Sequence, residues 1–167
     1  MLLKFFLNSN TSAYLREMAK EFGESTNSIR HELNNLTAAG YLIATESGRS
    51  VLYKANTAHP LYNELKNIVH KYLGIDRIRE DVVDKLLQRL GKLQLALITG
   101  DYAEGRDSGI IDLVLVGNLD VAYLNECVAK VEKLIHRKVR TLVLTPEEFE
   151  DKRLTLKPEK ALLLWGG

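Results

Sequence analysis

Residues 99–117 read TGDYAEGRDSGIIDLVLVG, and this stretch decides which fold the second half of the chain can have. A strand candidate at residues 93–99 leads into Gly100, and a loop rich in glycine and charge separates it from a second candidate at residues 110–116. Two acids separated by one apolar residue at the start of such a strand can hold divalent cations. Here Asp112 is present, and Ile110 holds the place of the other acid. A single acid does not make such a site, so the reading of this stretch depends on the segments around it.

The segments around this stretch read as further helices and strands. Residues 121–135 show helical spacing of apolar residues, and residues 139–144 and 161–165 are strand candidates. Thr145-Pro146-Glu147-Glu148 is a strong helix opening, because it offers an N-cap, a proline at the first position and an acid for a capping box. Ahead of the stretch, Asp76 is expected to cap a helix with an apolar stripe of Ile78, Val82, Val83, Leu86, Leu87 and Leu90.

This order resembles the small nucleotidyltransferases of the DNA polymerase β superfamily over about residues 76–165. The likeness is carried by the strand into Gly100, by Tyr102-Ala103-Glu104-Gly105-Arg106, by Asp112-Leu113-Val114-Leu115-Val116-Gly117 and by the Thr-Pro-Glu-Glu-Phe segment. The resemblance implies a loop that cradles phosphates, and two metals held by two acids on one strand and a third acid on its neighbour. The nucleotide-binding positions that it implies are Gly100, Asp101, Gly105, Arg106 and Asp112.

Three departures from that family argue against catalysis. Asp101 replaces a serine, Ile110 replaces the first metal carboxylate, and residues 140–144 supply no acid at the centre of the third strand. Since Mg²⁺ needs well-placed oxygens, we expect no catalytic residue, no metal and no cofactor, and only weak, vestigial nucleotide binding. Asp112 is then expected to bond loop amides near Gly100 or Gly109. The alternative is an active nucleotidyltransferase with a rearranged one-metal site that uses Asp101 and Asp107.

The first half of the chain predicts a winged helix. The expected elements are a helix at residues 2–7, a turn at residues 8–10, a helix at residues 12–22 capped by Thr11 or Ser12, a helix at residues 25–39 capped by Ser25, and strands at residues 41–45 and 51–55 around a hairpin loop at residues 46–50. Gly23 and Gly40 are expected to end the second and third helices. Ile29, Leu33 and Leu36 would face the core, which leaves a polar face on the other side of the third helix.

Residues 15–23, 25–36 and 39–42 resemble the winged-helix regulators of the ArsR type. In such proteins the second helix of the motif enters the major groove of double-stranded DNA. The DNA-binding residues that this implies are Thr26, Asn27, Arg30, His31 and Asn34 on the helix, with Arg49 on the wing. Glu24 departs from the family, which has an apolar residue in this turn. A winged helix can also serve as a protein-interaction module, so that alternative stays open.

A connecting helix is expected at residues 61–73, opened by Pro60 and ended by Gly74. The ArsR resemblance implies that this helix packs against its two-fold mate, whereas a plain interdomain helix would need no partner. We read His59 and His70 as structural residues. The expected divisions are residues 1–58 for DNA binding, 59–75 for the connection and 76–167 for the nucleotidyltransferase-like domain, together an α+β fold with a mixed sheet.

Composition adds only broad limits. The net charge is +1, with eight Lys and Arg against six Asp and Glu in residues 1–75, so the charge neither demands nor forbids a nucleic-acid partner. The single cysteine, Cys127, excludes a disulfide framework within the chain, and no apolar run reaches the ~20 residues of a membrane span. We expect a cytoplasmic, homodimeric DNA-binding transcriptional regulator whose inactive second domain serves dimerisation, ligand sensing or partner binding, with a nucleotide or another small molecule as a candidate effector. The alternatives are the rearranged enzyme and one protein of a toxin–antitoxin-like pair.

Overall fold

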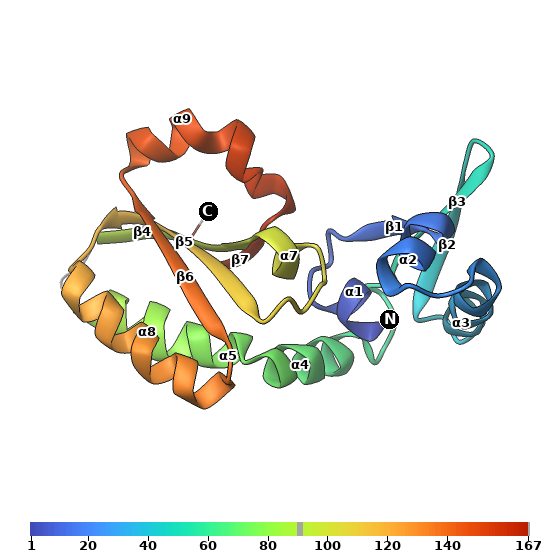
Figure 1. Ribbon diagram of the computed structural model, residues 1–167, viewed down its shortest axis with the longest axis horizontal. Coiled ribbons are helices and arrows are strands. Elements are labelled where there is room, and N and C mark those ends of the chain that lie inside the picture. Colours follow the sequence, from blue (N-terminus) through green and yellow to red (C-terminus); the bar gives the residue numbers. More distant parts are fainter. Residues whose placement is uncertain (90–91, 167) are drawn as a thin grey trace.

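The computed structural model describes residues 1–89 and 92–166, and its α+β chain forms two sheets at opposite ends of the molecule (Figure 1). The smaller, antiparallel sheet has the order β1-β3-β2, and the larger, mixed sheet has the order β6-β5-β4-β7. Helices α1 and α4 lie between the two ends (Figure 1). In the described residues no helix is long and apolar enough to cross a bilayer.

The first 55 residues fold as helices packed on a small sheet. The elements are α1 (Leu2–Phe6), β1 (Ser12–Tyr14), α2 (Leu15–Phe22), α3 (Thr26–Ala38), β2 (Leu42–Ser47) and β3 (Ser50–Ala55). Gly23 ends α2 with a positive φ of 67°, and the Ser25 hydroxyl accepts from the Ser28 amide at the start of α3, as the sequence predicts. The hairpin turn is shorter than predicted, because Ser47 pairs with Ser50 and only Gly48 and Arg49 remain outside the ladder.

The start of the second helix was predicted wrongly. Residues 12–14 are a strand, and Tyr14, not Thr11 or Ser12, is the N-cap of α2. Ser12 and Tyr14 pair with Lys54 and Leu52 of β3. This pairing satisfies backbone groups that a helix would otherwise have to satisfy, so tertiary context overrides the local spacing.

The connection between the two sheets is helical. It comprises α4 (Tyr62–Leu73), α5 (Ile75–Ile78), a π-helical turn (Arg79–Val83) and α6 (Asp84–Gln88). Gly74 separates α4 from α5 with a φ of 77°, and Asp76 lies inside the first turn of α5, so its predicted capping role is wrong. The predicted stripe is largely confirmed: Ile78, Val82, Val83 and Leu86 are buried, Leu87 is half-buried, and Leu90 lies outside the described residues. The π-helical turn shifts the helical phase, which allows adjacent Val82 and Val83 to be buried together.

The larger sheet matches the prediction closely. Its elements are β4 (Lys92–Thr99), α7 (Gly100–Ala103), β5 (Ile110–Asn118), α8 (Val121–Ile135), β6 (Lys138–Leu144), α9 (Pro146–Leu156), a 3₁₀ turn (Pro158–Lys160) and β7 (Leu162–Gly166). β5 runs parallel to β6 and antiparallel to β4. Helices α5 and α8 lie on one side of this sheet and α9 on the other (Figure 1). The short helix α7 lies inside the segment that the sequence predicted as a loop.

One hydrophobic core runs through both ends of the molecule. The cluster that contains Phe5 and Phe6 of α1 also contains Leu73 of α4 and Ile111 of β5. His70 and His59 have structural partners: His70 Nε2 lies 2.9 Å from the Leu7 carbonyl oxygen, and the His59 ring packs against the Tyr41 ring in a tilted arrangement. Burial lowers the pKa of His70. The helices between the sheets are therefore part of the common core.

Candidate functional site

The Gly100 loop begins where β4 ends, directly beside the first residues of β5. Thr99 pairs with Asp112, and Gly100 has a φ of 67°. A Cβ atom on Gly100 would lie 2.8 Å from Oδ2 of Asp112, and the positive φ favours glycine at this position. The structure thus brings Gly100 and Asp112 together, as the sequence predicts.

Asp112 is bound by an arginine of the neighbouring strand. Arg140 stands next to Asp112 in the parallel register of β5 and β6, and its Nε and Nη2 donate to the two carboxylate oxygens at 2.6 and 2.9 Å. The carboxylate of Asp112 raises the pKa of Arg140. The predicted bonds to loop amides are replaced by this bidentate pair, because a guanidinium matches both oxygens of a carboxylate at once. A cation of the neighbouring strand therefore neutralises the carboxylate of Asp112.

Asp101 forms a second pair of the same kind. Arg106 donates from Nε and Nη2 to Oδ1 of Asp101 at 3.1 and 2.7 Å, and its Nη2 lies 2.6 Å from Oε2 of Glu104. The hydrogen bonds from Arg106 lower the pKa of Asp101, so this carboxylate is charged at neutral pH. Two of the predicted nucleotide-binding residues thus bind one another.

Asp107 forms a third pair, which the sequence analysis missed. Arg137 donates from Nη2 to Oδ2 of Asp107 at 2.7 Å and from Nε to Oδ1 at 3.1 Å, and the Tyr102 hydroxyl donates to the same carboxylate. Arg137 lowers the pKa of Asp107, and burial beside Asp107 raises the pKa of Tyr102. Arg137 also donates to the carbonyl oxygens of Tyr72 and Ile135, so this pair joins the loop to the end of α4.

Gly105, also a predicted nucleotide-binding residue, packs against the backbone of α1. A Cβ atom there would lie 2.6 Å from both Cα and the carbonyl oxygen of Lys4, and the φ of Gly105 is 77°. This glycine lets the loop approach the backbone of α1. Among residues 1–89 and 92–166, no group of three or more His, Cys, Asp or Glu side chains is placed to hold a metal ion. A small cavity of about 200 Å³ adjoins Gly100 and is lined by Lys157 and Lys160, but of the five predicted residues only Gly100 borders it.

The predicted DNA-binding residues gather on an exposed surface. The five predicted residues on α3, namely Thr26, Asn27, Arg30, His31 and Asn34, are all exposed, while Ile29 and Leu33 are buried beneath them. The imidazole of His31 lies 3.1 Å from the amide nitrogen of Asn35. Arg49 is exposed in the two-residue turn of the β2–β3 hairpin, where Gly48 has a φ of 62°.

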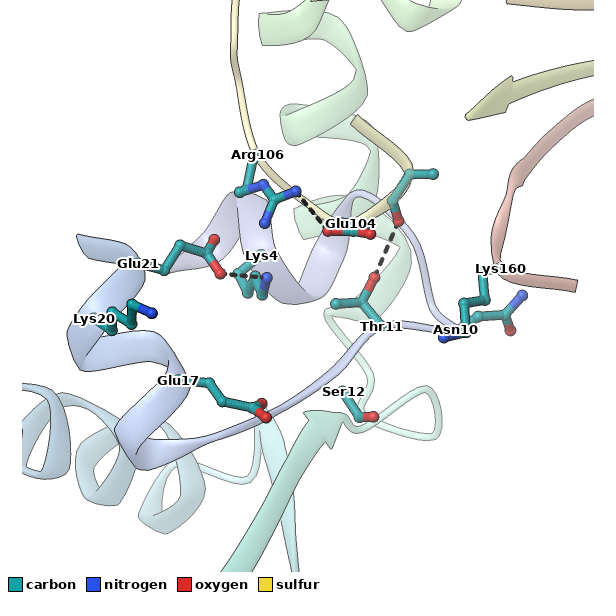
Figure 2. A pocket seen from close by; sticks show the side chains of 11 residues that line it. Lys4, Asn10, Thr11, Ser12, Glu17, Lys20, Glu21, Glu104, Arg106 and Lys160 are labelled. Atoms are coloured by element: carbon teal, nitrogen blue, oxygen red, sulfur yellow. Dashed lines mark hydrogen bonds and ion pairs between the residues drawn. The ribbon is translucent and has the colours of Figure 1, made fainter. Parts of the chain in front are cut away.

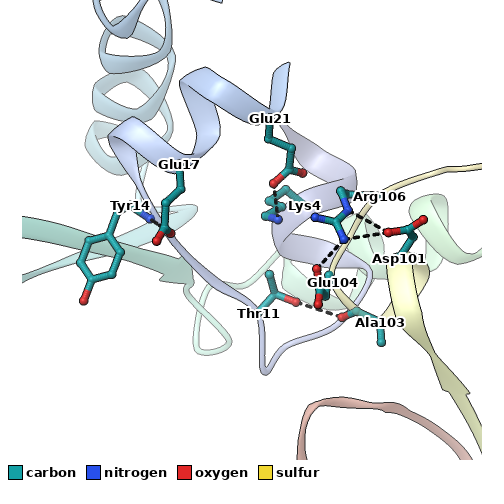
Figure 3. Close-up of polar contacts among 9 residues, drawn as sticks. All are labelled: Lys4, Thr11, Tyr14, Glu17, Glu21, Asp101, Ala103, Glu104 and Arg106. Carbon is teal, nitrogen blue, oxygen red and sulfur yellow. Dashed lines mark hydrogen bonds and ion pairs between the residues drawn. The ribbon is translucent and has the colours of Figure 1, made fainter. Parts of the chain in front are cut away.

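A cleft of about 710 Å³ separates the two ends of the molecule at α1 and α2 (Figure 2). Beside this cleft, hydrogen bonds join the first turn of the chain to the second half of the chain. The Asn8 amide donates to the carbonyl oxygens of Ala103 and Lys160, both at 2.9 Å, and the Thr11 hydroxyl donates to Ala103 at 3.3 Å. Figure 3 shows the ion pair Lys4–Glu21 beside Arg106. The sequence marked residues 8–10 only as a turn, so the role of Asn8 was missed.

Comparisons with known proteins find a similar solved structure but no family. No protein-family model matches the chain, and no curated protein matches it. Among solved structures, the chain is similar to one described as a mutant of the toxin–antitoxin pair MntA–HpeT. That similarity has 23% sequence identity and a TM-score of 0.39, and it covers 53% of this chain and 72% of the other.

Proposed function

We propose that this protein is a DNA-binding transcriptional regulator whose second half is a nucleotidyltransferase-like frame without catalytic activity. In this proposal residues 1–58 form an ArsR-like winged helix, residues 59–75 connect, and residues 76–167 carry the second domain. The observation that carries the proposal is the exposed polar face of α3, with Thr26, Asn27 and Arg30 outward and a hairpin beside it.

The chemistry of that face suits a DNA groove. Amide side chains can bond adenine edges, arginine can bond guanine edges, and short hydroxyls can bond phosphates. The flanking hairpin supplies Arg49 at its tip, where a winged helix contacts the sugar–phosphate backbone. Because the net charge is only +1, one copy would hold DNA weakly, and a dimer would add the affinity of a second half-site.

Helix α4 supports a dimer. Leu61, the N-cap of α4, precedes Leu65, Ile68 and Tyr72 at intervals of four, three and four residues, the spacing of a helix–helix seam, although Leu65 is half-buried against the protein's own core. Ile68 is 62% exposed and Tyr72 is 66% exposed, whereas Val69 on the other face of the helix is buried. We propose that this stripe packs against the same stripe of a second copy, because a stripe that faces its own copy needs no other complementary partner.

The three aspartate–arginine pairs support the absence of catalysis. Catalytic Mg²⁺ sites need free carboxylate oxygens that converge on the ion. A metal near Asp101, Asp107 or Asp112 would first have to displace a guanidinium from each carboxylate. We therefore propose that the loop is a structural element and that any nucleotide binding there is weak.

The test of DNA binding is selection from a random duplex pool, followed by affinity measurements on the selected site. Arg30→Ala and Asn27→Ala should each weaken binding by about 1–3 kcal/mol and relax the preference at one base pair. Lys152→Ala removes an exposed cation from α9 and should leave the affinity unchanged. If selected and random duplexes bind equally, and only at low salt, the chain is not a specific regulator.

A second candidate function, one half of a protein pair of the toxin–antitoxin kind, is favoured by the larger sheet. Leu163, Leu97, Val114 and Leu142 form one row across its four strands. The two central residues are buried, but Leu142 and Leu163 at the edges are 41% and 53% exposed, and Leu154 on α9 is 90% exposed. Co-expression with the protein encoded beside this one tests the candidate: a complex of fixed stoichiometry that Leu154→Glu or Leu142→Glu disrupts would support it over DNA binding.

A further inference from the structure

The cleft between the two ends of the molecule is lined by charged groups that the proposed DNA-reading surface does not use (Figure 2). One wall comes from α1, α2 and residues 10–12, and the other from residues 103–106 and Lys160. Its volume, about 710 Å³, falls within the ~300–1,000 Å³ of small-molecule sites. A molecule bound there would contact both ends of the chain at once.

The three acids of the cleft are already engaged. Glu21 holds Lys4 at 2.7 Å, and the side chains of this pair are only 18% and 8% exposed. Glu104 holds Arg106 at 2.6 Å, and Glu17 accepts from the backbone N–H of Tyr14 at 3.3 Å. Each acid therefore has an ion-pair or hydrogen-bond partner in the protein, although Oε1 of Glu21 is buried without one.

Two of the cations in the cleft are not engaged. Lys20 of α2 and Lys160 after α9 form no ion pair or side-chain hydrogen bond with any residue in the described ranges 1–89 and 92–166. Figure 2 shows them on opposite sides of the cleft, with Lys4 and Thr11 in the space between them in this view. Two unpaired ammonium groups that face a concave surface from opposite walls favour an extended ligand with negative charge at both ends.

We propose that this cleft binds a small organic polyanion, which Lys20 and Lys160 hold at its two ends. Arg106 offers a third contact, because its guanidinium already turns toward the carboxylate of Glu104 on the cleft side and can share an anionic oxygen. The ligand bridges α2 to the second half of the chain and fixes how the two ends sit relative to one another. Through this bridge it changes the affinity for DNA, a consequence that rests on the proposed function.

Titration calorimetry of the full chain with tripolyphosphate and with citrate, at constant ionic strength in KCl, tests the site. The two probes distinguish phosphate from carboxylate ligands. At least one should bind, Lys20→Ala and Lys160→Ala should each weaken that binding fivefold or more, and the double variant should lose it. Lys152→Ala, which removes a cation outside the cleft, should bind as the unmodified chain does.

Absence of binding by both probes overturns the proposal, as does an equal loss in all three single variants, since that pattern reports general charge attraction. Circular dichroism of each variant shows whether it is folded. A DNA titration with and without saturating probe then tests the coupling, and equal affinities overturn it. If no duplex is selected at all, the proposed function is wrong. The calorimetric result still decides separately whether the cleft binds a polyanion.

Discussion

Each aspartate near the Gly100 loop was visible in the sequence, but the arginines that bind Asp107 and Asp112 were not. Arg137 and Arg140 lie about thirty residues beyond Asp107 and Asp112, and only the parallel pairing of β5 and β6 brings them there. Sequence spacing identifies acids that could hold a metal, yet it cannot show whether a cation of the protein already neutralises them. At the residue scale, the sequence therefore predicted where the loop lies but not which cations neutralise its carboxylates.

Gly105 provides a test of how closely the loop packs on α1. Gly105→Ala should lower the free energy of unfolding by about 1–2 kcal/mol for the positive φ and by roughly 1–3 kcal/mol more for the clash with Lys4. Gly109→Ala is the matched control, because Gly109 has a φ of 79° and an added Cβ would meet nothing within 4 Å. Urea unfolding measures both, and equal losses would contradict a close approach at Gly105.

The Asp107–Arg137 pair predicts a specific pH dependence of stability. Hydrogen bonds from Arg137 lower the pKa of Asp107 in the folded state, so the pair stabilises the protein above the unfolded-state pKa of about 3.9. This stability is lost as the pH falls through the lower, folded-state pKa. Asp107→Asn should therefore be less stable than the unmodified chain at neutral pH, and the difference should shrink in acid. Urea unfolding between neutral pH and pH ~2 checks this, and a constant difference across that range would refute it.

At the scale of the element, local signals predicted those helices whose ends are set by their own residues. Thr145 caps α9 and closes a capping box with Glu148, and Ser25 caps α3, as expected. The strand β1 was missed because its three residues become a strand only by pairing with β3, some forty residues later. The helix after Gly74 was predicted as a single regular one because a π-helical turn has no distinct spacing signal.

A single charged substitution in the stripe on α4 tests whether the protein forms the proposed dimer. Ile68→Glu places a carboxylate in the centre of the proposed helix–helix seam, where desolvation of the charge opposes association. The variant should be a monomer in sedimentation or light scattering at concentrations where the unmodified chain is a dimer. Asn67→Glu is the matched control, since Asn67 is exposed, adjacent in sequence and outside the stripe. If both variants keep the mass of the unmodified chain, α4 is not the interface.

At the scale of the whole molecule, the two halves that the sequence suggested share one core. Phe5 and Phe6 are fully buried in the cluster that continues into the larger sheet, although local patterns assigned them only to a short first helix. Sequence patterns mark the apolar face of an element but not the element it will meet. The halves were therefore predicted well as separate units, while the helices, hydrogen bonds and cleft between them were not.

Asn8 provides a test of the join between the halves. Asn8→Ala removes the donor of the Lys160 carbonyl oxygen and leaves the Ala103 carbonyl oxygen with only the longer bond from Thr11, and it should cost about 1–3 kcal/mol of unfolding free energy. Asn10→Ala should cost little, because Asn10 is exposed and only its backbone N–H bonds Asn8. Trp165 fluorescence follows unfolding of β7, and circular dichroism follows the helices. Equal stabilities of the two variants would show that Asn8 does not tie the halves together.

The bond between Asn8 and Lys160 also sets the order in which the protein can be completed during its synthesis. It joins residues 152 positions apart, so the ribosome has made most of the chain before the first turn finds both of its acceptors. Contacts of such long range slow folding, because the entropy of closing the loop must be lost before they form. The phenylalanines of α1 find a partner earlier, because Phe6 packs against Tyr62 of α4. The phenylalanines of α1 are therefore exposed to aggregation until α4 has emerged.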